Sequence, residues 1–248
     1  MEVTRFSEIA LRNRQINNPL SPRTLDWIIE RCDPPPGSRV LDVGCGKAEF
    51  LLRLLDQRTV EGVGIDASER TIAFARARAR DRRLKGTLRL LWGDARSLSA
   101  PAGEYFLTVC LGATHALGGL RGTLGALRNW TQPGGRIVVG EGFWSQPPTT
   151  EYLGLLNAAP NELLDDSGNV RTGEELGLRL VERWLSTEEE WDEFEDAYLE
   201  GIESYARESP NDTDVPAMIE RIRVWRQGYL RWGKQTLGFG VYIFRIES

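Results

Sequence analysis

The sequence predicts an α/β fold with a mostly parallel sheet that is covered by helices on both faces. Between residues 39 and 140, short apolar runs alternate with segments whose apolar residues recur at helical spacing. Strands that alternate with helices are joined by crossover connections, which place the strands parallel in one sheet. The 248 residues, of which 41% are hydrophobic, suit one α/β domain with an insertion, or two small domains.

Each expected strand is a short apolar run bounded by turn residues. The expected strands cover residues 39–43, 60–66, 88–92, 105–111, 136–140, 180–185 and 239–246. The expected helices cover residues 49–56, 69–84, 123–130, 173–178, 187–207 and 217–234. Residues 1–32 are expected to form a helical lead-in, in which Ser21 and Pro22 are typical of a helix start. The prolines of residues 33–37 then end this lead-in.

Charge and cysteine content argue against several classes of partner. The 36 acidic and 31 basic residues give a net charge of −5, whereas binding to nucleic acid or to an anionic membrane requires an excess of Lys and Arg. The arginine-rich run from Arg70 to Arg83 is interpreted as a solvated helix face. Three cysteines without metal-type spacing, and no expected signal peptide or membrane span, predict a cytoplasmic protein with reduced thiols and no metal site.

The most informative segment covers residues 40–50. An apolar run passes through Gly44 and Gly46 and opens a new apolar pattern, which predicts a strand, a tight turn and a helix. This geometry holds nucleotide-like cofactors. Asp66 ends the next expected strand, where an acid accepts hydrogen bonds from ribose hydroxyls, and Asp94 ends the third, next to the expected adenine edge. Three such features on consecutive strand ends predict an adenosine cofactor.

Two acids distinguish between adenosine cofactors. A dinucleotide fingerprint requires a small residue where this chain has Glu49. A glutamate at a helix start would also repel a pyrophosphate. Asp42 precedes the glycines and suits a positive charge. A cationic cofactor without phosphates, S-adenosylmethionine (SAM), therefore fits better than a dinucleotide.

These segments resemble the motifs of the class I SAM-dependent methyltransferases. The likeness covers residues 35–145 and is found in Leu41-Asp42-Val43-Gly44-Cys45-Gly46, Gly64-Ile65-Asp66-Ala67-Ser68, Gly93-Asp94-Ala95 and Pro133-Gly134-Gly135-Arg136. Ala48 stands where the family often has a third glycine, and alanine is tolerated there if the backbone is already helical. Ile16-x-Asn18-Pro19, Gly112-Ala113-Thr114 and Gly140-Glu141-x-x-Trp144 further resemble a bacterial group of small-molecule methyltransferases, whose N-terminal segment closes over the cofactor.

The resemblance implies a Rossmann-like sheet of seven strands and a division of the chain into four parts. These are an N-terminal helical lid (1–36), a SAM-binding core (37–186), a helical insertion that forms the acceptor lid (187–236) and the last core strand (237–248). The cofactor would be SAM, with S-adenosylhomocysteine (SAH) as product. The implied cofactor-binding residues are Asp42, Gly44, Cys45, Gly46, Asp66, Ala67, Asp94, Ala95 and Leu111.

Methyl transfer is an in-line displacement, which requires an aligned acceptor, exclusion of water and, for a protonated acceptor, a base. His115 is the only histidine and follows the fourth expected strand, so it is either that base or a residue that positions the acceptor. Glu141 ends the fifth strand and is a second base, a site for a cationic acceptor, or a hydrogen-bond partner of the N-terminal lid. The expected acceptor-binding residues are Asn18, Trp144, Tyr152 and Tyr229.

The predicted function is SAM-dependent methyl transfer to a small-molecule acceptor. One alternative is a non-catalytic SAM-binding or scaffold protein. Another is a nicotinamide-dependent oxidoreductase, which Glu49 and the lack of a Tyr-x-x-x-Lys relay disfavour. An RNA or protein methyltransferase would need a basic or grooved surface. Oxygen, nitrogen, sulfur and carbon acceptors all use this scaffold.

Overall fold

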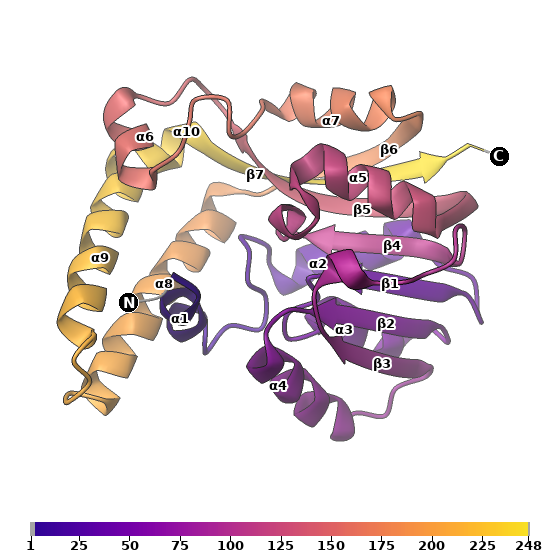
Figure 1. Ribbon diagram of the computed structural model, residues 1–248, viewed down its shortest axis with the longest axis horizontal. Coiled ribbons are helices and arrows are strands. Elements are labelled where there is room, and N and C mark those ends of the chain that lie inside the picture. Colours follow the sequence, from indigo (N-terminus) through magenta and orange to yellow (C-terminus); the bar gives the residue numbers. More distant parts are fainter. Residues whose placement is uncertain (1–2, 248) are drawn as a thin grey trace.

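The computed structural model describes residues 3–247, and its centre is a seven-stranded sheet in the order β3-β2-β1-β4-β5-β7-β6 (Figure 1). The strands are β1 (Arg39–Val43), β2 (Glu61–Asp66), β3 (Thr87–Trp92), β4 (Tyr105–Leu111), β5 (Thr131–Trp144), β6 (Leu178–Leu185) and β7 (Leu237–Ile246). Among these strands, β7 alone runs opposite to the others. The predicted fold class is therefore confirmed. Met1, Glu2 and Ser248, the ends of the predicted lid and last strand, lie outside the described residues.

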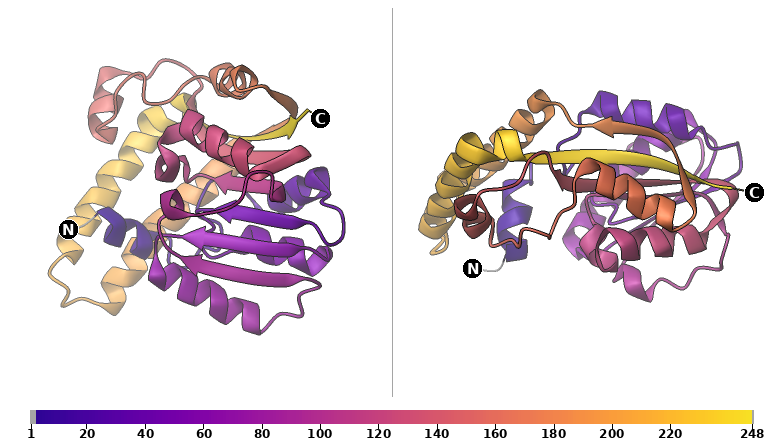
Figure 2. Two further views of the ribbon diagram at one scale, coloured as in Figure 1. Left: turned by 45° about the vertical axis from the view of Figure 1, so that its right-hand side comes forward. Right: turned by 90° about the horizontal axis from the view of Figure 1, so that it is seen from above.

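The helices cover both faces of the sheet (Figure 2). Their bounds are α1 (Val3–Ala10), α2 (Pro22–Cys32), α3 (Glu49–Gln57), α4 (Glu69–Arg80), α5 (Gly119–Trp130), α6 (Thr150–Leu156), α7 (Asp166–Glu175), α8 (Glu188–Glu208), α9 (Val215–Gly228) and α10 (Lys234–Thr236), with a π-helical turn at Tyr229–Gly233. Because side chains alternate along a strand, Val40 packs with α2, α3 and α4 on one face, whereas Leu41 and Val43 pack with α5 on the other. Within the described part of the chain, no helix is long and apolar enough to cross a membrane.

Several predicted bounds after residue 130 are wrong. Strand β5 is much longer than the predicted 136–140, because it pairs with β7 as far as Trp144. The helix predicted at 173–178 is α7, which begins earlier because Asp165 caps it by accepting from the N–H of Gly168. The chain leaves that helix at Gly177, where φ is 75°. Helix α6 was not predicted.

Helix α1 packs against the helical insertion. We call α1, α8 and α9 the cap; Figures 1 and 2 show it beyond one end of the sheet. Phe6 and Ile9 of α1 share a buried cluster with Ile202 of α8 and Ile222 of α9. The N-terminal segment and the helical insertion, both expected to contribute to a lid, are thus in direct contact through these helices.

Gly201 allows the close approach of α8 to α1, since a Cβ at this position would collide with the carbonyl of Ala10. We expect Gly201→Ala to destabilise the protein by about 1–3 kcal/mol, because overpacking forces the backbone to shift. Gly125→Ala is the matched control: nothing lies within 4 Å of its Cβ position in α5, so the change should stabilise by about 1 kcal/mol. Thermal unfolding of both variants measures the difference, and equal unfolding free energies would contradict the packing described.

Candidate active site

The turn between β1 and α3 is held by the end of β2. Gly44 and Gly46 adopt left-handed backbone, with φ of 67° and 53°. The N–H groups of Gly44 and Cys45 both donate to the carbonyl of Ile65, at 2.8 and 3.1 Å. The N–H of Gly46 donates to Oδ2 of Asp66 at 2.9 Å. Asp66 therefore shapes the turn in addition to offering a carboxylate beside it.

The backbone at Ala48 differs from expectation, since this residue is left-handed, with φ 58° and ψ 26°. The right-handed helix begins only at Glu49, so the condition under which alanine was expected to be tolerated is not met. A left-handed backbone costs an L-residue about 1–2 kcal/mol. Full burial of the methyl group and a hydrogen bond from the Ala48 N–H to the carbonyl of Cys45, at 2.8 Å, offset this cost.

Two carboxylates face the cavity beside this turn. Asp42 is 3% exposed, and both Asp42 and Asp66 line a cavity of about 200 Å³. Burial raises the pKa of Asp42 well above its usual range, and the nearby charge of Asp66 raises it further. A bound cation would oppose both causes of this shift, so the cavity suits a positively charged ligand and disfavours an anion.

The far wall of the cavity comes from a segment between α1 and α2. We call residues 11–18 the strap, because its residues Gln15 to Asn18 lie over the glycine turn and line the cavity. The amide of Asn18 donates to the carbonyl of Leu111, at 3.3 Å. Its Oδ1 is buried and has no hydrogen-bond partner among the described residues. An unpaired buried acceptor beside a cavity indicates a ligand that donates to it.

The structure brings together most of the residues predicted to bind the cofactor. The predicted residues that line the cavity are Asp42, Gly44, Cys45, Gly46, Asp66 and Leu111, and Asn18 joins them from the strap. Ala67, Asp94 and Ala95 do not line the cavity. The carboxylate of Asp94 pairs with Arg96, with 2.6 Å between Oδ2 and Nη2, and caps a short 3₁₀ turn.

Other residues that line the cavity were not among those predicted to bind the cofactor. They are Gln15, Ile16, Asn17, Leu25, Lys47, Glu49, Phe50, Gly112 and Ala113. Lys47 and Glu49 follow the glycines directly, and this adjacency was the available signal. The strap residues lie some thirty positions before the turn, and the signal for them was the resemblance, which implies an N-terminal segment that closes over the cofactor.

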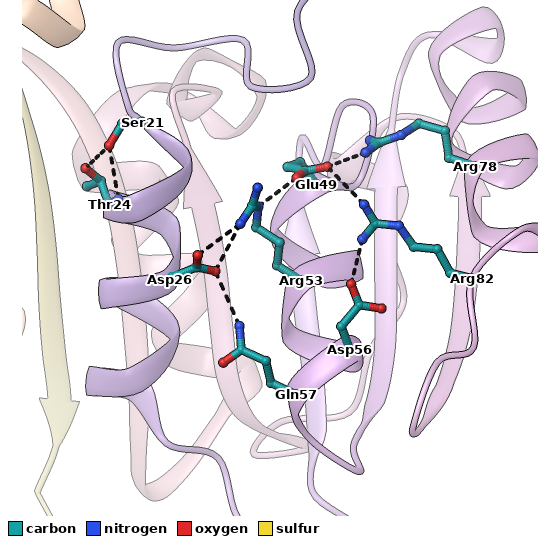
Figure 3. A network of polar contacts seen from close by, with 9 residues as sticks. All are labelled: Ser21, Thr24, Asp26, Glu49, Arg53, Asp56, Gln57, Arg78 and Arg82. Carbon is teal, nitrogen blue, oxygen red and sulfur yellow. Dashed lines mark hydrogen bonds and ion pairs between the residues drawn. The ribbon is translucent and has the colours of Figure 1, made fainter.

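Glu49 is the centre of an ion-pair network (Figure 3). It is 4% exposed and pairs with Arg53 of its own helix, with 2.7 Å between Oε1 and Nε. It also pairs with Arg78 of α4, and Arg82 lies 4.0 Å away. Its charge is thus compensated, which removes the repulsion expected between Glu49 and a pyrophosphate. The arginine-rich run is also not simply a solvated face, because Arg78 and Arg82 point inward.

A second cavity brings His115 and Glu141 together. It has a volume of about 300 Å³, is lined also by Thr114 and Asn169, and shares Gly112 with the first cavity. The N–H of Gly142 donates to Oε1 of Glu141 at 2.9 Å. Burial raises the pKa of Glu141, although hydrogen bonds from Thr114 and Gly142 and the neighbouring His115 oppose the shift. The arrangement places a carboxylate and an imidazole beside the shared wall.

The three aromatic residues predicted to bind the acceptor line neither of these cavities. Trp144 donates its Nε1–H to the carbonyl of Pro160 at 3.1 Å. Tyr152 packs against Trp232, with ring centroids 6.0 Å apart. Tyr229 lines a separate cavity of about 260 Å³. These side chains were grouped by residue type, and the sequence contained no signal for their distance from His115.

Comparisons with known proteins identify methyltransferases as relatives of this chain. A family model described as a methyltransferase domain matches residues 40–135. The Escherichia coli (strain K12) protein YjhP, described as uncharacterized, is 26% identical over 244 residues, which is 98% of each chain. Its X-ray structure has a TM-score of 0.91 and covers 98% of this chain and 100% of its own.

Two further relatives have descriptions that name an activity. A SAM-dependent methyltransferase from Geobacter sulfurreducens, crystallised with S-adenosyl-L-homocysteine, is 27% identical, with a TM-score of 0.91 and 98% of each chain covered. The demethylmenaquinone methyltransferase of Thermus thermophilus is 32% identical over 161 residues, which is 61% of this chain and 69% of that protein. The glycine turn, the acids on the strand ends and these relatives agree: the chain belongs to the class I SAM-dependent methyltransferases.

Proposed function

We propose that this protein binds SAM in the cavity under the strap and methylates a small molecule in the neighbouring cavity. The observation that carries this proposal is the wall at Gly112, which is common to both cavities. Methyl transfer requires two ligands to meet at one point, about 3 Å apart, with water excluded. The name of the Thermus relative, a demethylmenaquinone methyltransferase, also supports a small-molecule acceptor.

The residues of the first cavity fit SAM. Asp66 ends β2 with its carboxylate beside the glycine turn, where ribose hydroxyls would donate to it. Asp42 offers a buried carboxyl group whose ionisation a bound cation would favour. The unpaired Oδ1 of Asn18 accepts a hydrogen bond from the bound ligand. When bound, SAM supplies a methyl group on a positively charged sulfur, which makes the methyl carbon electrophilic.

The second cavity supplies the groups that an acceptor needs. An acceptor oxygen or nitrogen attacks the methyl carbon as the carbon–sulfur bond breaks, so SAH leaves as the product and the acceptor loses a proton. His115 accepts this proton in the proposal, since its imidazole lines the second cavity. Glu141, with its raised pKa, hydrogen-bonds the acceptor or orients the imidazole. SAH release from a panel of amines, phenols, thiols and carbon acids tests the proposal, and a protein that binds SAM but forms no SAH with any of them would contradict it.

His115→Ala is expected to lower turnover by about a hundredfold or more, since general base catalysis contributes about 10²–10⁴ to a rate. The affinity for SAM should change little, because His115 lines the second cavity and not the first. Steady-state kinetics gives the turnover and calorimetry the affinity. Arg121→Ala, which removes an exposed side chain that pairs with Glu175, is the control. Unchanged turnover in His115→Ala would remove His115 from catalysis.

A further inference from the structure

Lys47 joins the glycine turn to the strap. It directly follows Gly46 and is 9% exposed. Its ammonium group donates to the carbonyls of Leu11 and Arg12, at 2.8 Å each, and to the carbonyl of Arg14. Three main-chain carbonyls of one short segment therefore converge on a single side chain. A side chain with these contacts holds the path of the strap's backbone.

Arg78 of α4 adds a second attachment beside the first. It donates to the carbonyl of Lys47 at 3.2 Å and to Oε1 of Gln15 in the strap at 2.8 Å. The strap is attached to the cap as well. Arg12 pairs with both carboxylate oxygens of Glu208, at 2.8 and 2.6 Å, and Arg14 donates to the carbonyl of Glu193 at 3.0 Å. The strap therefore links the cofactor turn to the helices of the cap.

The cavity under the strap is smaller than the pockets that usually hold a ligand of the size of SAM. Its volume is about 200 Å³, whereas pockets that hold drug-sized ligands have about 300–1,000 Å³. The Gly44 side of the cavity has no spare room, because a Cβ at Gly44 would collide with the side chain of Ala113. The opposite wall is the strap, a segment without helix or strand between α1 and α2. A ligand of this size therefore needs one wall of the cavity to move, and the strap is the wall without helix or strand.

We infer that Lys47 is a latch: it holds the strap closed over the cofactor cavity and so couples cofactor exchange to movement of the cap. This inference rests on the proposed function for the identity of the ligand. The role of Lys47 as a latch depends only on its hydrogen bonds to the strap and not on which ligand binds. Opening would break the three bonds of Lys47 and move the strap backbone, to which α1 is directly continuous.

The surroundings of Lys47 explain why the carbonyls are its partners. Arg78 and Arg70 of α4 are the charged groups that act on the ammonium group of Lys47. The carboxylate of Glu49 is paired with Arg53 and Arg78, and that of Glu8 accepts a hydrogen bond from the hydroxyl of Ser68 at 2.9 Å. Burial, together with the charges of Arg78 and Arg70, lowers the pKa of Lys47 to about 8. The latch should weaken as the pH rises through this value, because the neutral amine has one donor fewer and no charge.

Trypsin tests the latch without any cofactor, because the strap contains Arg12 and Arg14 as cleavage sites. We expect Lys47→Met to raise the rate of cleavage after these residues by about tenfold, since opening is the step that exposes the strap. Lys85→Met is the matched control, because Lys85 also donates to a main-chain carbonyl, that of Gln57 at 3.3 Å, but far from the strap. Cleavage rates within about twofold of the wild type in Lys47→Met would overturn the inference.

Rapid-mixing kinetics with SAH distinguishes a latch from a direct ligand contact. Loss of a latch should speed both association and dissociation of SAH, by about tenfold each, whereas loss of a contact speeds dissociation alone. Faster dissociation with unchanged association and unchanged cleavage would therefore overturn the latch. A wild-type protein that does not bind SAH would refute the proposed function, while the cleavage experiment would still decide on the latch.

Circular dichroism shows whether Lys47→Met folds. If it does not, a pH series on the wild type and on Lys47→Arg tests the inference instead. In the wild type, SAH release and trypsin cleavage should both accelerate between about pH 7 and pH 9, relative to Lys47→Arg at the same pH. Lys47→Arg retains its charge throughout this range, so its SAH release should stay nearly constant. The same pH dependence in the wild type and in Lys47→Arg would overturn the inference.

Discussion

Replacing Asp66 with alanine is expected to weaken SAM binding by about a hundredfold or more. The change removes the carboxylate that would accept hydrogen bonds from two ribose hydroxyls, and each hydrogen bond to a charged group contributes about 1.5–3 kcal/mol. The change also removes the acceptor for the Gly46 N–H, so part of the loss would come from a distorted turn. The sheet should survive, since Asp66 is the last residue of β2 and only partly buried. Calorimetric titration with SAM measures the affinity, and thermal unfolding verifies the fold.

Two further variants separate the causes of this loss. Asp66→Asn retains a carbonyl oxygen for the Gly46 N–H but removes the charge, so an intermediate affinity would assign the remainder to the ribose contacts. Asp81→Ala, at an exposed position just after α4, is the control and should bind SAM as the wild type does. An affinity of Asp66→Ala equal to that of the wild type would refute the assignment of the cofactor cavity.

Glu195→Gln is expected to stabilise the protein at pH 8 by up to about 3 kcal/mol and to have little effect near pH 4.5. Glu195 is 2% exposed inside the cap, where the neutral indole N–H of Trp225 donates to both of its oxygens, at 3.0 and 3.3 Å. Arg226 pairs with Asp196 instead. Burial raises the pKa of Glu195 to about 7, and Asp196 and Asp192 add to the shift, whereas Trp225 and Arg226 oppose it.

The sign follows from proton linkage. The pKa of Glu195 is higher in the folded state than in the unfolded state, so protonation of Glu195 favours folding. This contribution to the free energy of unfolding is fully present below about pH 4.5 and is lost as the pH rises through about 7. Glutamine is neutral at every pH and should abolish the dependence. Denaturant unfolding of both proteins from pH 4.5 to pH 8 gives the difference, with Glu200→Gln on the exposed face of α8 as control. A stability difference independent of pH would contradict a buried, titrating Glu195.

The core elements were predictable because local and global signals agree there. The predicted bounds of β1 and β4 are those of the structure, since each is an apolar run closed by a turn. The glycine turn and Asp66 were predictable for the same reason, because a strand, a turn and a helix within thirty residues leave few arrangements for the strand ends. The errors at β5 and α7 have different causes, because pairing with β7, far along the chain, extends β5, whereas the Asp165 cap sets the earlier start of α7.

Only the part of the cofactor cavity that lies on the glycine turn was predictable from local sequence patterns. Asp42 and Gly46 lie on the turn itself, whereas Asn18 and the rest of the strap reach it across the fold. Tyr229 was predicted to bind the acceptor because it is aromatic, but residue type does not state what Tyr229 or the nearby Trp225 packs against. In the structure the cap uses these aromatics for its own interior, around Glu195 and Asp192.

The sequence by itself determined the fold class, the order of the strands along the chain and the side of the cofactor cavity that contains the glycine turn. These features depend on residues close together in the chain, so their patterns report them directly. Only the tertiary structure decided that Arg78 neutralises Glu49, and that Lys47 donates to three carbonyls of the strap. Each of these depends on long side chains that meet across many residues of chain, where neither periodicity nor spacing specifies a partner.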